Sequence, residues 1–412
     1  MLFEDLPLSK PILQGIAEIG HLNPTPIQEK VIPEVLRRND VIACAQTGTG
    51  KTGAFAIPIL QLLNKKIGDS IDYKTLPVLI ISPTRELAVQ ISENIRAYAK
   101  YTNIKSGVVF GGASMQPQIN LLKSGLHILV ATPGRLLDLR KQGIINLDEI
   151  KILVLDEADL MLDMGFIDEV QKIIRLSPNL EQRLMFSATI PAKVQDLAKT
   201  LLQNPEKIEL TPNSSAAPAI NQHLYLVPRP DKTELLLYIM RNIVKDQSVL
   251  IFRRTKFGVE KALESLTKNG FKAEALHGDK NQSDRTTALN KFKNKEVNIL
   301  VATDLAARGL DIDSLDYVIN FDIPSMSEVY VHRIGRTGRA GSSGKAISFC
   351  SADEKDYIKF IETLIGKKIP VEENNPYPLD KNAEPVVHKK KGSKHKKGRK
   401  GEGSKAKKKR WY

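Results

Sequence analysis

The chain has 412 residues, 42% of them hydrophobic and 26% charged, which is an ordinary globular composition with room for two or three domains. Its two cysteines, Cys44 and Cys350, are too few for a disulfide framework, so we expect a reducing compartment rather than secretion. We find no run of about 18 apolar residues, and the start of the chain carries Glu4 and Asp5. These features argue against a membrane span or a cleaved signal peptide.

The net charge of +14 is concentrated at the carboxyl end of the sequence. Residues 381–412 contain 14 Lys and Arg against two Glu, a net of +12, so the other 380 residues carry only +2. Such a tail suits a polyanion, because binding releases the counterions of the polyanion. The charge pattern favours nucleic-acid binding, and the alternative is a solvated tail that serves only solubility.

Short apolar runs in the first 200 residues have the length and character of buried strands, and most precede a helix-compatible stretch. The predicted strands are Val41–Ala45, Val78–Ile81, Gly107–Phe110, Ile128–Ala131, Ile152–Leu155 and Leu184–Phe186. This alternation implies right-handed crossovers and a parallel sheet covered by helices on both faces. The stretch 211–218 has two prolines and no apolar period, so we interpret it as a linker.

The alternation restarts after this linker and predicts a second α/β domain of ordinary size. Its predicted strands and helices are Val249–Phe252, Ile299–Ala302, Tyr317–Asn320, Ala346–Phe349, Glu234–Ile243 and Phe257–Leu266. From about Asn374 the chain is rich in Pro, Gly, Ser and Lys and cannot bury enough apolar surface to fold alone.

A glycine-rich segment, Ala-Gln-Thr-Gly-Thr-Gly-Lys-Thr at 45–52, follows the first predicted strand and precedes a predicted helix. Glycines let the backbone wrap a phosphate, with amide groups and a helix N-terminus facing the anion. Lys51 would reach the β- and γ-phosphates, and the Thr52 hydroxyl would hold Mg²⁺. The alternative is a glycine-rich turn without a ligand, which the Lys-Thr pair at the helix start disfavours.

Two carboxylates, Asp156 and Glu157, follow the predicted strand 152–155 within the sequence Asp-Glu-Ala-Asp. Ligands of parallel sheets bind at the carboxyl ends of the strands. Asp156 would bind the Mg²⁺ shell, and Glu157 would orient and deprotonate the attacking water. The alternative is an acidic helix start favoured by the helix dipole, which becomes less attractive beside a phosphate loop.

With these motifs the chain resembles the DEAD-box ATP-dependent RNA helicases of superfamily 2, over about residues 1–365. It looks most like the bacterial RhlE-type group, which pairs a compact core with a basic tail. The resemblance implies two tandem RecA-like domains, ATP and Mg²⁺ as cofactors, and RNA as partner. In such proteins Ala45 is the usual variant of the phosphate loop, whose nucleotide contacts would be Gln46, Thr47, Gly48, Thr49, Gly50, Lys51 and Thr52.

The resemblance also implies roles in adenine recognition and in coupling. Gln28 would hydrogen-bond the adenine edge and Phe3 would stack on the ring, although Gln28 also stands at N3 of a capping box started by Thr25. Ser187 and Thr189 match the motif that links the ATP state to unwinding.

Domain two would complete the ATP site. Arg336 and Arg339 match arginine fingers that meet the γ-phosphate, and a guanidinium there neutralises developing charge. Gly309 and Asp311 match the ribose-side motif, and His332 matches a coupling residue.

The RNA path implied by the resemblance runs over both domains and uses hydroxyls, glycine turns and Arg forks, which suit phosphate oxygens rather than base edges. Its residues are Thr84, Arg85, Gly112, Thr132, Arg135, Arg254, Arg285 and Thr303. We therefore expect little sequence preference from the core.

The sequence thus predicts an ATP hydrolase that closes its two domains on ATP and RNA and unwinds short duplexes non-processively. An ATP-gated RNA clamp and a DNA-translocating motor remain open alternatives. The expected segments are a Q-motif region at 1–29, an ATP-binding domain at 30–208, a linker at 209–219, a second domain at 220–372 and a basic tail at 373–412. We expect a cytoplasmic monomer without membrane contact. Its protein partners are left open, and ribosome-assembly factors and RNA-decay factors are both conceivable.

Overall fold

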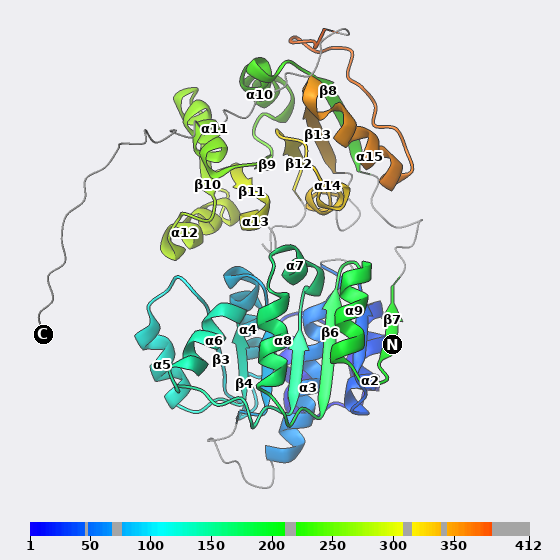
Figure 1. The fold of residues 1–412 in the computed structure, drawn as a ribbon, viewed down its shortest axis with the longest axis vertical. Coiled ribbons are helices and arrows are strands. Elements are labelled where there is room, and N and C mark those ends of the chain that lie inside the picture. Colours follow the sequence, from blue (N-terminus) through cyan, green and yellow to red (C-terminus); the bar gives the residue numbers. More distant parts are fainter. Residues whose placement is uncertain (46–47, 68–75, 211–219, 308–314, 339–343, 381–412) are drawn as a thin grey trace, which may run out of the picture.

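A computed structural model describes residues 1–45, 48–67, 76–210, 220–307, 315–338 and 344–380. It contains two α/β domains, each built on a fully parallel sheet, and Figure 1 shows them one above the other. The predicted fold class is therefore confirmed. The predicted linker at 211–218 and the cationic residues 381–412 lie outside the described residues.

Domain one has a seven-stranded sheet in the order β3-β4-β2-β5-β6-β1-β7. Its strands are β1 (Val41–Cys44), β2 (Val78–Ile81), β3 (Ser106–Val109), β4 (Ile128–Ala131), β5 (Ile152–Leu155), β6 (Gln182–Ser187) and β7 (Glu206–Glu209). Its helices are η1 (Phe3–Asp5), α1 (Lys10–Glu18), α2 (Pro26–Leu36), α3 (Lys51–Ile67), α4 (Arg85–Tyr98), α5 (Met115–Lys123), α6 (Pro133–Lys141), α7 (Ala158–Asp163), α8 (Ile167–Arg175) and α9 (Ala192–Leu201).

The central strands of domain one are buried on both faces, so each contributes to two cores. In β2, Ile80 belongs to the core beneath α1 to α4, whereas its neighbour Leu79 belongs to the core beneath α6 to α9. Alternate side chains of a strand point to opposite faces, which explains this division. Fully burying such a side chain contributes roughly 1.5 to 3 kcal/mol, and both layers of helices are held in this way.

Domain two has a six-stranded sheet in the order β10-β11-β9-β12-β13-β8. Its strands are β8 (Asn221–Leu226), β9 (Val249–Arg253), β10 (Ala273–Leu276), β11 (Ile299–Thr303), β12 (Tyr317–Asn320) and β13 (Lys345–Cys350). Its helices are η2 (Arg229–Asp231), α10 (Lys232–Ile239), the π-helical η3 (Met240–Val244), α11 (Lys256–Lys268), α12 (Gln282–Lys293), α13 (Asp304–Ala307), α14 (Ser327–Ile334), η4 (Ala352–Glu354) and α15 (Lys355–Ile365).

The chain after α15 covers the free edge of β8. Leu224 donates its N–H to the Pro370 carbonyl over 2.8 Å and accepts from the N–H of Glu372 over 2.9 Å. The Leu226 carbonyl accepts from the N–H of Leu379 and from the side-chain amide of Asn375. These contacts continue beyond 372, where the sequence places the end of domain two; the domain limits themselves stay predictions.

The strands that the sequence did not predict are β7, β8 and β10, and each is an edge strand. In β7 only Ile208 is buried, and β10 carries Glu274 in its middle. An edge strand has fewer neighbours to bury its side chains, so it lacks the continuous apolar run that marks a central strand.

Parallel strands place all their carboxyl ends at one edge of a sheet, and these edges face each other across the gap between the domains. Helix α7, which follows β5, lies at the top of domain one, and α14, which follows β12, lies at the bottom of domain two (Figure 1). Among the helices that the structure describes, none combines the length and apolarity needed to span a bilayer.

Candidate active site and nucleic-acid interface

The loop between β1 and α3 bends through two glycines in a conformation that other residues rarely adopt. Gly48 and Gly50 have φ of 85° and 92°, in the left-handed region that favours glycine. A Cβ on Gly50 would lie 2.7 Å from Gln28 Nε2 and 2.8 Å from Thr25 Oγ1. Position 50 therefore requires glycine both for the turn and for its packing against the start of α2.

Lys51 begins α3 and is buried, with 5% of its surface exposed. Its Nζ atom lies 2.9 Å from Glu157 Oε1. Burial alone would lower the pKa of Lys51, but the attraction of Glu157 and Asp156 outweighs it, and the pKa is raised. The ammonium group thus stays charged beside a helix N-terminus, where anionic phosphates bind favourably.

Asp156 follows β5 and is also buried. Burial, together with the nearby charge of Glu157, raises the pKa of Asp156 to about 7, and Lys51 opposes this rise. The Oδ1 atom of Asp156 is buried without a hydrogen-bond partner. Because an uncompensated buried carboxylate oxygen is unfavourable, Asp156 fits a divalent cation. Among the described residues no cluster of three or more metal-ligand side chains forms, and Mg²⁺ commonly needs only one or two carboxylates beside substrate phosphates.

Glu157 has an unusual backbone conformation. Its φ and ψ are 56° and 55°, in the left-handed region. Of the five non-glycine residues with positive φ in the described ranges, only Glu157 is buried. Such a conformation costs of order 1 to 3 kcal/mol and persists only where the surroundings fix it. The turn places the carboxylate against Lys51 at the edge of the sheet.

The fourth residue of the Asp-Glu-Ala-Asp sequence joins this edge to β6. Asp159 Oδ2 accepts from both the N–H and the hydroxyl of Thr189, each over 2.9 Å. Ser187 Oγ accepts from the N–H of Asp159 over 3.2 Å. The structure therefore brings the predicted coupling residues Ser187 and Thr189 into contact with Asp159, which sequence reasoning did not assign. The sequence signal that could have identified Asp159 is its position two residues after Glu157, in the same Asp-Glu-Ala-Asp segment.

Gln28 occupies the position that the capping alternative requires. Its Oε1 atom accepts from the N–H of Thr25 over 2.9 Å, and its Nε2 atom donates to the Gly50 carbonyl over 3.1 Å. The side chain thus ties α2 to the phosphate loop and is 3% exposed. Phe3 is also 3% exposed and packs within the core of domain one. Their contacts with adenine stay predictions.

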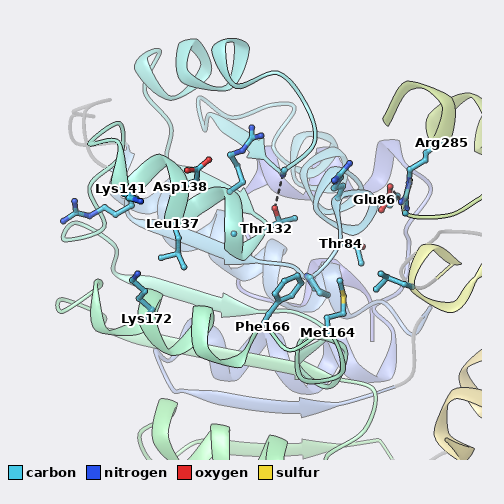
Figure 2. Close-up of a pocket in the computed structure, with 18 of the residues that line it drawn as sticks. Thr84, Glu86, Thr132, Leu137, Asp138, Lys141, Met164, Phe166, Lys172 and Arg285 are labelled. Atoms are coloured by element: carbon cyan, nitrogen blue, oxygen red, sulfur yellow. Dashed lines mark hydrogen bonds and ion pairs between the residues drawn. The ribbon is translucent and has the colours of Figure 1, made fainter. Parts of the chain in front are cut away.

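A cleft of about 980 Å³ lies between the domains and collects most of the predicted RNA contacts (Figure 2). From domain one it is lined by Thr84, Arg85, Gly111, Thr132 and Arg135, and from domain two by Gly278, Arg285 and Leu305. Thr84 caps α4 by accepting from the N–H of Leu87, and the hydroxyl of Thr132 accepts from the N–H of Gly111. Helix starts and glycine turns thus form this surface.

The absence of a side chain at Gly112 leaves room for the guanidinium of Arg85 in the cleft. A Cβ on Gly112 would lie 2.3 Å from the Arg85 guanidinium, and its φ of 76° also favours glycine. Arg135 Nη2 donates to the Ala113 carbonyl over 3.0 Å, while its Nη1 atom is buried without a hydrogen-bond partner. Arg285 Nε is likewise buried without a partner. Unsatisfied guanidinium donors suit phosphate oxygens.

An ion pair between α12 and α4 crosses the cleft. Arg285 Nη2 of α12 lies 2.9 Å from Glu86 Oε1 of α4, and only 9% of each side chain is exposed. Figure 2 shows the two side chains approaching from different domains. Gln282 also reaches Glu86, over 3.4 Å. Arg285 therefore belongs to the domain contact as well as to the predicted RNA path, and Glu86 is a further residue that the sequence did not assign.

The predicted RNA contact Arg254 lies farther along domain two. Its Nη2 atom donates to the Ile323 carbonyl over 2.8 Å and lies 3.3 Å from Glu354 Oε1. Glu354 is buried and is paired over 2.6 Å with Lys232, which is itself 2% exposed. This buried pair holds Glu354 in place, and Glu354 in turn positions the guanidinium of Arg254. A second cleft, of about 620 Å³, includes Arg254 together with Phe166 of domain one.

Arg333 is the residue of domain two whose importance the sequence understated. It is 3% exposed, and it forms a forked ion pair with Asp304, with distances of 2.5 and 2.7 Å. It also donates to Asn320 and to the Asp322 carbonyl. Since Asp304 follows the predicted RNA contact Thr303, this fork links the RNA path to α14. Three arginines lie within residues 333–339, and their local spacing alone does not show that Arg333 has a different role from Arg336.

The remaining predicted residues of domain two are only partly described. His332 lies within α14, and Arg336 follows that helix and is 8% exposed. In domain one, Thr52 lies in the first turn of α3 and Thr49 lies in the loop just before this helix. The predicted contacts outside the described residues are Gln46, Thr47, Gly309, Asp311 and Arg339.

Two family models match the chain in the order of its domains. The DEAD/DEAH box helicase model matches residues 25–197, and the helicase conserved C-terminal domain model matches residues 231–341. The chain belongs to the DEAD/DEAH box helicase family. This confirms the predicted family, whereas the RhlE-type subgroup stays a prediction.

Similar proteins span most of this DEAD-box chain. The Helicobacter pylori DEAD-box ATP-dependent RNA helicase RhpA is 41% identical over 367 residues, which are 89% of this chain and 73% of RhpA. CshA of Geobacillus kaustophilus, described in the same words, is 40% identical over 382 residues, 93% of this chain and 80% of CshA.

Solved structures of both domains together are also similar. Yeast (S. cerevisiae) Dbp5 bound to RNA and ADP BeF3 has a TM-score of 0.78 and 30% identity, over 90% of this chain and 95% of Dbp5. Mss116p bound to ssRNA and AMP-PNP has a TM-score of 0.79 and 30% identity, over 90% of this chain and 79% of that one.

Replacing Lys51 with Ala tests the phosphate site of this DEAD-box protein. The variant loses the ammonium group at the start of α3 and leaves Glu157 buried without its partner, so we expect ATP hydrolysis to fall to background in a phosphate-release assay. Lys65→Ala, an exposed lysine on the same helix, is the matched control and should keep normal turnover. Normal turnover in Lys51→Ala would rule out this loop as the phosphate site.

Proposed function

We propose that this protein is an ATP-dependent RNA helicase that hydrolyses ATP between its two domains and separates short RNA duplexes locally. Membership of the DEAD-box family supports the activity. The observation that carries the proposal is the buried cluster of Lys51, Asp156 and Glu157 at the sheet edge that faces domain two. The cluster pairs a phosphate-binding cation with two carboxylates and is joined through Asp159 to the coupling loop.

The residues of the ATP site divide into binding and chemical roles. Lys51 would bind the β- and γ-phosphates, and Glu157 would accept the proton of the attacking water. Arg336 and Arg339 of domain two would stabilise the charge that develops on the transferred phosphoryl group. Thr52 and Asp156 would hold Mg²⁺, which neutralises phosphate charge when bound.

Nucleotide selection would use the free bonding capacity of Gln28. Its Oε1 atom accepts from the Thr25 N–H, and its Nε2 atom donates to the Gly50 carbonyl. A second lone pair on Oε1 and a second N–H on Nε2 remain available. An adenine edge offers one donor and one acceptor that match them. Phe3 would contact the ring, and Gly309 with Asp311 would contact the ribose.

The RNA strand would lie in the cleft between the domains and be held by its phosphates. Arg135 and Arg285 each carry a buried donor without a partner there, and Thr84 and Thr132 present hydroxyls at helix starts. Arg254 and Thr303 would extend the contacts over domain two. Contacts of this kind do not read base edges, so the core would bind RNA with little sequence preference.

Closure of the two domains would couple the ATP site to the RNA path. ATP and RNA each touch both domains, so each ligand is bound more tightly in the closed arrangement and favours it. The Glu86–Arg285 ion pair crosses the cleft, and Asp159 connects Glu157 to Ser187 and Thr189. Hydrolysis and phosphate release would then reopen the cleft. We also propose a cytoplasmic location and a monomeric state.

The choice of nucleic acid provides the first test. We expect RNA to stimulate ATP hydrolysis more than DNA of the same sequence, and a short RNA duplex to be separated during turnover. Steady-state ATPase measurements with matched RNA and DNA, together with a gel-based strand-separation assay, check both. Equal stimulation by DNA would favour a translocating motor, and stable RNA binding without strand separation would favour a clamp.

Glu157→Gln separates hydrolysis from closure. Loss of the general base should slow ATP hydrolysis by roughly 10²- to 10⁴-fold, while complexes with ATP and RNA still form because the binding contacts remain. Single-turnover hydrolysis and RNA anisotropy with ATP measure the two effects. Glu181→Gln, an exposed carboxylate of domain one, is the control. If Glu157→Gln instead abolishes nucleotide binding, Glu157 is not the base.

Deletion of residues 381–412 tests the cationic tail. We expect weaker RNA binding and a smaller salt dependence, with the slope of log K against log salt reduced by about 0.7 for each single-strand phosphate that the tail neutralises. Titrations at several salt concentrations give this slope. A variant whose tail lysines and arginines are replaced by Gln and Ser at equal length should match the deletion. An unchanged slope would return the tail to a role in solubility.

A further inference from the structure

Phe257 is the most exposed large apolar side chain in the part of the chain that the structure describes, with 77% of its surface accessible. It lies in the first turn of α11, whose buried residues Gly258, Val259, Ala262 and Leu266 face the core of domain two. Phe257 therefore contributes almost nothing to that core. The face of its ring is therefore accessible to a binding partner.

The helix turn that carries this ring is tied to a loop that lines the cleft assigned to RNA. The preceding residue, Lys256, is ion-paired with Asp279, and Asp279 follows Gly278, which lines the cleft. Thr255 caps α11 by accepting from the N–H of Gly258 over 3.0 Å. These interactions fix the first turn of α11, which carries Phe257, beside the loop after β10 that contributes Gly278 to the cleft.

The guanidinium of Arg253 packs against the same turn of α11. A Cβ on Gly258 would lie 3.0 Å from Arg253 Nη2. Arg253 is followed by Arg254, one of the RNA contacts expected in domain two. Phe257 thus follows a predicted phosphate contact by three residues, on a turn that Arg253 contacts.

Phe257 is flanked by lysines, one of which, Lys256, is paired with Asp279. Lys256 precedes it and has 63% of its side chain exposed, and Lys261 lies one turn farther on the same face of α11. The neighbouring carboxylate of Glu260 is already engaged by His277 over 2.6 Å and by Lys280 over 3.4 Å. An exposed ring flanked by cations is the arrangement on which unpaired bases stack while their phosphates are neutralised.

We propose that Phe257 is a base-stacking position that binds one nucleobase of the RNA strand where it leaves the cleft over domain two. The inference rests on the proposed function, because it extends the RNA path assigned there. It adds a different kind of contact: the cleft residues hold phosphates, whereas Phe257 takes the face of a base. Stacking accepts any base, so this position adds affinity without reading sequence.

Full-length Phe257→Ala provides the test, with fluorescence anisotropy of a twelve-nucleotide oligouridine in the presence of AMP-PNP. We expect binding about five-fold weaker or more, the lower end of what one stacked base contributes. Phe257→Tyr should bind as the unchanged protein does, because its ring stacks equally well. Phe360→Ala removes a ring that is 64% exposed on α15, on the other side of domain two, and should have no effect (Figure 1).

Abasic RNA distinguishes stacking from a change elsewhere in the site. We test a set of oligouridines, each with a single abasic position. One of them should bind the unchanged protein as weakly as intact oligouridine binds Phe257→Ala. That abasic RNA should bind Phe257→Ala no more weakly than intact RNA does, because the same contact is already lost. Equal affinity of Phe257→Ala and the unchanged protein, or additive effects at every abasic position, would overturn the proposal. If the unchanged protein itself fails to bind oligouridine, the proposed RNA-binding function fails instead.

Discussion

The buried ion pair of Lys51 and Glu157, next to the buried carboxylate of Asp156, is the interaction on which the rest of the site depends. Lys51 and Asp156 are almost inaccessible, and a buried charge is tolerated only when it is compensated. Lys51 is compensated by Glu157, whereas the buried Oδ1 of Asp156 has no partner within the described protein. In the proposed function, a Mg²⁺–nucleotide complex would supply both missing charges, a cation for Asp156 and phosphates for Lys51. The left-handed turn at Glu157 is what gathers these groups.

Strand direction explains why one site can be shared by two domains. Every strand pair that the structure describes in the two sheets is parallel, so the loops that follow these strands gather at one edge of each domain, and the two edges face each other. Chemistry placed on such loops is incomplete until the edges approach. The Glu86–Arg285 pair shows that contact across the gap can be made by side chains that also line the cleft between the domains. In the proposed function, domain contact and RNA binding would therefore use the same groups.

The sequence was informative where a residue's environment leaves a local pattern and uninformative where the environment is made by distant segments. Central strands such as Val78–Ile81 could be predicted because burial on both faces demands a continuous apolar run, whereas the edge strand Glu206–Glu209 has no such run. The capping role of Gln28 followed from local spacing, but its bond to Gly50 required the fold. The fork of Arg333 on Asp304 and the exposure of Phe257 likewise depend on packing that no short motif encodes.

The segment that runs along β8 has a consequence for how copies of this protein can meet. Unpaired backbone groups on an outer strand invite another chain to add itself to a sheet. At Leu224 and Leu226 those groups are already occupied by Pro370, Glu372 and Leu379 from the same chain. Recruitment of a second molecule by strand addition would have to displace this intramolecular pairing first. Self-association through this side of domain two would therefore have to rely on side-chain surfaces rather than on a shared, continuous sheet.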